Sequence, residues 1–202
     1  MPNEKVTQFA AQFREPKDLK RQSNPNLKEM TAALDGLRAL GAEGVTGLVA
    51  LLKPDSEGGD VHVRHALHGQ AMRAGGWPEK DRQAFTKALA GTLKEDHPKS
   101  AKGFVIRQLQ VAGGAEVTTA LGEWLLDDEL WEDAAQALLA IGGTADQFLK
   151  ALPKAKGKQQ LTTVQALGVL KIDNAAASAP LAARALALRK RAWASSACSA
   201  RR

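Results

Sequence analysis

Cysteine, tyrosine and β-branched residues are scarce in this chain of 202 residues. It has one cysteine, no tyrosine and nine aromatic residues in all. The lone Cys198 excludes an intramolecular disulfide, and with it a disulfide-stapled scaffold. Valine and isoleucine number 10 and 3, against 37 alanines and 26 leucines. Because alanine and leucine favour helices while β-branched and aromatic residues favour strands, this balance predicts an all-helical protein and excludes a β-sandwich, a β-barrel or a Rossmann-type sheet.

Long hydrophobic runs are also missing. No 18 apolar residues occur in succession, and the nearest approach, residues 175–188, is interrupted by Arg184. The polar N-terminal residues lack the apolar segment of a secretory signal. We therefore expect a cytoplasmic protein without a membrane partner.

The net charge of +6 is unevenly distributed. Residues 1–160 are neutral overall, whereas residues 161–202 carry seven basic residues and one acidic residue. A basic chain can indicate a nucleic-acid partner. Here the positive charge belongs to the C-terminal end and is weak evidence about a partner for the rest of the chain.

Glycine ends four amphipathic stretches, and the first glycines of these sites are 34, 38 and 29 residues apart. A glycine just past a helix supplies the left-handed backbone that lets the chain turn. Each site therefore predicts the turn of a helix–turn–helix unit. The four sites are Ala39-Leu40-Gly41, Ala74-Gly75-Gly76, Ala112-Gly113-Gly114 and Ile141-Gly142-Gly143.

Helical periodicity supports these units and sets the domain boundaries. In the fourth unit, five apolar residues recur at helical spacing and predict one buried face: Trp131, Ala134, Ala135, Leu138 and Leu139. A fifth unit begins near Leu161 and continues after Asn174. We expect a polar, mostly irregular segment over 1–26 with one short helix between residues 4 and 13, a single repeat domain over 27–190, and a basic tail over 191–202.

Two stretches carry a family resemblance. They are WEDAAQALLAIGGTADQFLKAL, residues 131–152, and KGFVIRQLQVAGGAEVTTALGEWLL, residues 102–126. Each joins two Ala/Leu-rich helices through a glycine turn and resembles a HEAT repeat. The resemblance implies an α-solenoid of about five stacked helix–turn–helix repeats, a right-handed superhelix whose second helices line a concave binding surface. It says little about function, because HEAT arrays look alike whatever they bind.

Candidate chemical groups are few. His62, His65 and His68 form an H-x-x-H-x-x-H run, but on a helix the three side chains spread over roughly 120° and do not converge on one metal ion. The acidic residues 127–133 are expected to complement the N-terminal dipole of the following helix. Cys198 has no histidine beside it, and no phosphate-binding glycine loop occurs. We expect no catalytic residue, no metal and no cofactor.

The sequence thus predicts a non-catalytic scaffold or adaptor that binds a protein partner through the second helices. Six polar residues are the expected contacts: Lys80, Gln83, Lys87, Glu116, Glu123 and Lys150. One alternative is a nucleic-acid-binding protein of the alkylpurine DNA glycosylase type, suggested by Trp124 and Trp131 with acids between them. Another is a bilin-lyase-like HEAT protein with a small-molecule substrate. The mixed signs of the six contacts disfavour a phosphate-binding groove, and the tryptophans fit core faces.

Overall fold

A computed structural model describes residues 3–13 and 27–170 of the chain. This part is entirely helical and contains no strand. Cys198, the continuation of the fifth unit after Asn174 and the tail 191–202 lie outside the described residues. The α-helices are α1 (Glu4–Ala11), α2 (Leu27–Ala39), α3 (Ala42–Ala50), α4 (Val61–Ala74), α5 (Glu79–Thr92), α6 (Lys99–Ala112), α7 (Thr118–Gly122), α8 (Trp131–Ile141), α9 (Ala145–Ala151) and α10 (Gly157–Val169).

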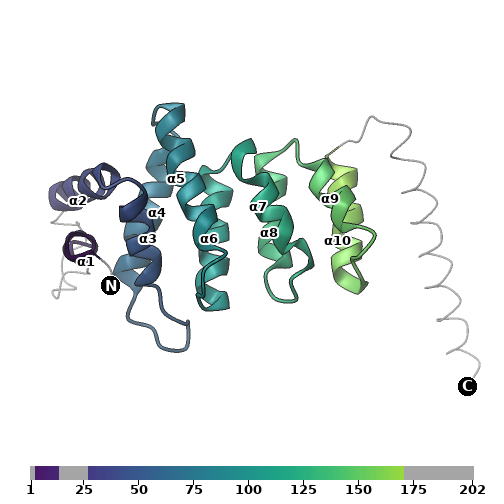
Figure 1. Ribbon diagram of the computed structural model, residues 1–202, viewed down its shortest axis with the longest axis horizontal. Coiled ribbons are helices and arrows are strands. Elements are labelled where there is room, and N and C mark those ends of the chain that lie inside the picture. The colour runs from purple at the N-terminus through teal and green to yellow at the C-terminus, as the bar shows by residue number, and fades with distance from the viewer. Residues whose placement is uncertain (1–2, 14–26, 171–202) are drawn as a thin grey trace, which may run out of the picture.

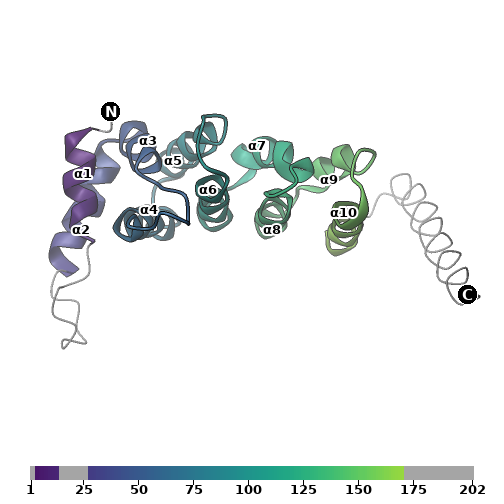
Figure 2. The same ribbon diagram turned by 90° about the horizontal axis from the view of Figure 1, so that it is seen from below.

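The helices alternate between two rows (Figures 1 and 2). We call α4, α6, α8 and α10 the first-helix row, and α3, α5, α7 and α9 the second-helix row. Short 3₁₀ segments, η1 (Ala115–Val117) and η2 (Glu123–Leu126), flank α7. Neighbouring helices pack side by side within the rows, α4 on α6, α6 on α8, and α3 on α5. None of the helices in the described ranges has the length and hydropathy needed to cross a bilayer.

Small residues let the helices of the first-helix row approach closely. On α8, Ala134, Ala135 and Leu138 are buried at the spacing that the sequence predicts. The adjoining face of α6 includes Gly103, where a Cβ would lie 2.9 Å from an oxygen of the Asp133 carboxylate. This apolar contact between α6 and α8 forms the centre of the core.

The N-terminal helix α1 packs against α2 and α3. It lies within the stretch where one short helix is expected, and it buries Val6 and Ala10. Two glycines make room for it, because a Cβ at Gly36 would clash with the ring of Phe9 and one at Gly47 would lie 3.0 Å from Val6. At these two positions the side chains of α1 pack directly against the backbone of α2 and α3.

The glycine turns do not share one backbone conformation. Gly41 and Gly142 have positive φ angles of 57° and 75°, as the helix-stop interpretation requires. Helices α4 and α6 also end directly before Gly75 and Gly113, but these glycines lack the left-handed backbone, with φ angles of −61° and −71°. At Gly113 a side chain lacks space, since a Cβ there would lie 2.4 Å from the Leu109 carbonyl oxygen and 2.9 Å from a methyl group of Val117. At Gly75 a Cβ would meet nothing within 4 Å, and nothing in the structure explains the glycine.

We expect Leu138→Ala to lower the free energy of unfolding by about 2–5 kcal/mol, because Leu138 is fully buried between helices and its truncation leaves a cavity. The matched control is Leu161→Ala on α10, where the leucine is 58% exposed and the expected change is below about 0.5 kcal/mol. Urea unfolding followed by circular dichroism measures both. Equal losses in the two variants would contradict the arrangement of the core.

Candidate protein-interaction surface

Three of the six predicted contact residues lie exposed on the second-helix row without an ion pair to any described residue. Lys80 and Lys87 are exposed on α5, seven residues apart and therefore on one side of the helix, and Lys150 is exposed on α9. Their ammonium groups are free to meet an external partner. We call the exposed side of α3, α5, α7 and α9 the outer face.

Two further predicted residues are partly engaged with neighbours. The Gln83 side chain donates a hydrogen bond to a carboxylate oxygen of Glu79 at 2.7 Å, within the same helix. Glu123 is exposed in η2. Its carboxylate lies 3.6 Å from the ammonium of Lys94, in the turn after α5, and this ion pair joins that turn to η2. Both residues border the outer face, but their polar groups already have partners.

Glu116 does not lie on the outer face, contrary to the sequence expectation. Its side chain is only 7% exposed. The carboxylate accepts hydrogen bonds from the Arg82 guanidinium at 3.0 Å, the Thr86 hydroxyl at 2.6 Å and the Gly114 amide at 3.1 Å. Glu116 therefore fastens η1 to α5 and is not available to a partner.

Arg82 is the basic partner in this ion pair. Its guanidinium also bonds the Glu79 carboxylate at 2.7 Å and the Ala112 carbonyl at 2.8 Å. The hydrogen bond from Arg82 lowers the pKa of Glu79 to about 2. Burial opposes ionisation of Glu116, but the hydrogen bonds from Thr86 and Arg82 outweigh it and hold the pKa of Glu116 below its ordinary 4.5. Arg82 and Glu116 are 34 residues apart, and this repeat-length interval between opposite charges was a signal available in the sequence.

The predicted histidine and acidic clusters are structural. His68 Nδ1 lies 2.8 Å from the side-chain Oε1 of Gln108 on the neighbouring helix, and no group of three His, Cys, Asp or Glu side chains in the described ranges could hold a metal ion. Asp127 accepts hydrogen bonds from two backbone amides before α8 and pairs with Lys99. Burial opposes its ionisation, but Lys99 and these amides keep the pKa of Asp127 below the usual value. Asp133 pairs with Arg107 of α6 at 3.1 Å.

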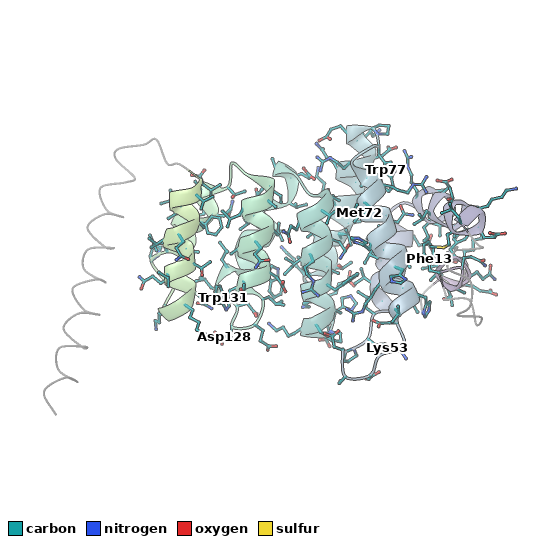
Figure 3. The ribbon with its side chains drawn as sticks, turned by 180° about the vertical axis from the view of Figure 1, so that it is seen from behind. Phe13, Lys53, Met72, Trp77, Asp128 and Trp131 are labelled. Atoms are coloured by element: carbon teal, nitrogen blue, oxygen red, sulfur yellow. The ribbon has the colours of Figure 1, made fainter. Side chains whose placement is uncertain are left out.

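The two tryptophans that suggest a glycosylase belong to different rows. Trp124 in η2 packs against the core, and the ammonium groups of Lys99 and Lys102 lie 5.4 and 5.1 Å from its ring centre. Trp131 is half-buried at the start of α8, in the first-helix row (Figure 3). Trp124 is thus already covered by lysines of its own chain.

Comparisons with known proteins identify no relative of this chain. No family model matches the chain, and no curated protein and no solved structure matches it. The class that the described residues define is an all-helical protein whose helices alternate between two rows.

We expect Glu116→Gln to lower the free energy of unfolding by about 1–3 kcal/mol at neutral pH, because the nearly buried Arg82 loses one of its two charged acceptors and keeps only Glu79. The folded pKa of Glu116 lies below 4.5, so its stabilising effect is present above that pH and is lost as the pH falls through the folded pKa. The gap between wild type and variant should therefore shrink in acid. Urea titrations at a series of pH values measure it.

The control for this experiment is Glu57→Gln, which removes an exposed carboxylate in the loop before α4 that has no ion pair among the described residues. Its unfolding free energy should follow the wild type at every pH. A Glu116→Gln gap that stays constant into acid would show that the loss is not electrostatic.

Proposed function

We propose that this chain is a non-catalytic scaffold or adaptor that binds a protein partner along its outer face. The fold we propose for it is a HEAT-like α-solenoid of about five helix–turn–helix repeats, with α10 as the first helix of the fifth. The supporting feature is the regular alternation of helices between two rows. Within the rows α3 packs on α5, α4 on α6 and α6 on α8, and across the rows α5 packs on α6, α7 on α8 and α9 on α10. Such arrays use the side of their second helices as an extended binding surface.

The free charges of the outer face carry the proposal. Lys80, Lys87 and Lys150 have no ion pair with a described residue. The carboxylates beside Lys80 on α5 are paired, Glu79 with Arg82 and Asp81 with Arg38 at 2.6 Å, whereas the exposed Asp146 on α9, four residues before Lys150, has no ion pair with a described residue. On α5, intramolecular pairing thus leaves Lys80 and Lys87 as the charges that a partner can neutralise, and an acidic protein segment would be attracted to them.

A protein fits this surface better than a nucleic acid does. A groove for a phosphate backbone carries positive charge along its whole length. Here Glu79, Asp81 and Glu123, whose side chains remain 65%, 47% and 53% exposed, are each paired with a basic side chain, so the unpaired positive charge of the outer face is confined to separate lysines and does not run along its whole length. A folded partner of mixed charge can place its acids at the lysines alone.

The perturbed titratable groups support a non-catalytic role. Glu79, Glu116 and Asp127 are the described carboxylates with clearly lowered pKa values, and each is engaged in an ion pair with a basic side chain. Active sites use perturbed groups in a cleft, next to the substrate. In this chain the lowered pKa values of Glu116 and Asp127 result from contacts with neighbouring elements, and that of Glu79 from Arg82 and Gln83 of its own helix.

We expect the triple variant Lys80→Glu, Lys87→Glu and Lys150→Glu to lose proteins that the wild type captures from a nuclease-treated cell extract. The matched control reverses three exposed lysines away from the outer face, Lys53, Lys154 and Lys158, and so changes the net charge equally. Quantitative mass spectrometry of the captured proteins compares the three forms. Capture that is unchanged in the first variant would exclude the outer face, and capture that nuclease abolishes would favour the nucleic-acid alternative.

A further inference from the structure

A cavity of about 530 Å³ lies where the α2–α3 pair meets the α4–α5 pair. This volume is in the range of protein pockets that bind small molecules. Apolar side chains form most of its wall, among them Leu37, Val45, Leu48, Trp77 and Phe85. Trp77, at the turn between α4 and α5, lies on the side of that pair that faces the N-terminal helices (Figure 3).

One wall residue carries an unsatisfied acceptor. Gln70 of α4 is 3% exposed, and its amide NH₂ donates to the Leu34 carbonyl oxygen at 2.5 Å. Its Oε1 is buried and accepts no hydrogen bond from any described residue. A buried acceptor without a donor destabilises the folded state. A donor that enters the cavity would recover this free energy.

The mouth of the cavity is polar but has no free negative charge. The Arg38 guanidinium lies 4.7 Å from the centre of the Trp77 ring and bonds the Asp81 carboxylate at 2.6 Å. The second wall carboxylate, Asp35, pairs with Arg73 at 2.7 Å. Both acids are therefore neutralised by their own chain and would not repel an acidic ligand.

The cavity opens beside the free lysines of the outer face. Ala84 of α5 is exposed and also lines the cavity. It is four residues after Lys80 and three before Lys87, so the three residues lie along one side of α5. A chain that crosses this side of α5 can place one side chain in the cavity and its neighbours at the two ammonium groups.

We propose that the cavity receives a tryptophan or tyrosine side chain from an acidic segment of the protein partner. The inference rests on the proposed function and names the chemistry of its central contact. An aromatic ring fits the apolar wall, and the indole N–H or phenol O–H is the donor that Gln70 lacks. Buried Trp and Tyr anchors contribute most of the binding energy in many interfaces, while flanking acids would meet Lys80 and Lys87.

Binding requires a small movement of Gln70. Its Oε1 has almost no exposed surface, so the amide must turn toward the cavity before a donor can reach it. The side-chain NH₂ resonances of Gln70 and the indole N–H of Trp77 therefore report directly on occupancy. Both are observable by ¹H–¹⁵N NMR in the full chain.

The test uses the peptide acetyl-Glu-Asp-Trp-Asp-Glu-amide and two analogues, one with alanine and one with 1-methyltryptophan in place of tryptophan. We expect the tryptophan peptide to shift the Gln70 and Trp77 resonances. Its affinity should exceed that of the alanine peptide by about tenfold or more, because the anchor is removed. The 1-methyl analogue should bind about threefold to tenfold more weakly, because it keeps the ring and lacks the donor.

Two protein variants locate the site. Ala84→Phe places a large side chain at the mouth, on an exposed helical position that tolerates it, and should abolish binding of the tryptophan peptide. The matched control, Ala140→Phe at an exposed position of α8, should leave the affinity unchanged. Lys80→Glu combined with Lys87→Glu should weaken the acidic peptide while free indole, which needs only the cavity, still shifts the Trp77 resonance.

The proposal is overturned if the tryptophan and alanine peptides bind equally, or if Ala84→Phe leaves the tryptophan peptide unaffected. It is also overturned if free indole enters the cavity and the tryptophan peptide does not, since the cavity is then a small-molecule site. These results are separate from failure of the proposed function, which would appear as unchanged protein capture by the triple lysine variant.

Discussion

Each helix pair of this chain is apolar on a side that it cannot cover by itself, and the fold depends on the neighbouring pair to cover it. Helix α8 illustrates the constraint, because it packs on α6 and on α10. Leu109 of α6 and Leu138 of α8 are both fully buried in the continuous core that results. Stability is therefore shared between adjacent pairs, and the position of every surface side chain follows from how two neighbours pack.

The polar contacts between pairs show the same dependence on neighbours. Arg82 and Glu116 join the second unit to the third with a nearly buried ion pair, at a position where leucines would otherwise do the joining. At the preceding junction, where α2 and α3 meet α4 and α5, small residues lie between the units. Gly41, Ala42 and Gly44 line the cavity there, and a Cβ at Gly41 would meet nothing within 4 Å. The two junctions thus differ, because one is closed by an ion pair and the other contains a cavity.

Periodicity predicted the helices well, because the spacing of Ala134, Ala135 and Leu138 depends only on local helical geometry. It placed Lys80, Lys87 and Lys150 on an exposed face for the same reason. It failed for Glu116, whose burial depends on an arginine 34 residues away. The glycine pattern located the turns but not their conformations, since at Gly113 glycine is needed to avoid the Leu109 carbonyl and Val117 and not to supply a positive φ angle. The cavity was beyond sequence reasoning altogether, because it depends on what two units leave unfilled.

The two ends of the stack differ in a way that gives it a direction. At one end α1 presents Glu4, Lys5 and Gln8 to solvent over the buried Val6 and Ala10. At the other, α10 exposes Leu161 and Val169, which are 58% and 68% accessible. Among the described residues, α10 therefore offers more exposed apolar surface to any element that packs against it than the solvent side of α1 does. A helix added to the protein in trans would bury more apolar surface against α10 than over α1.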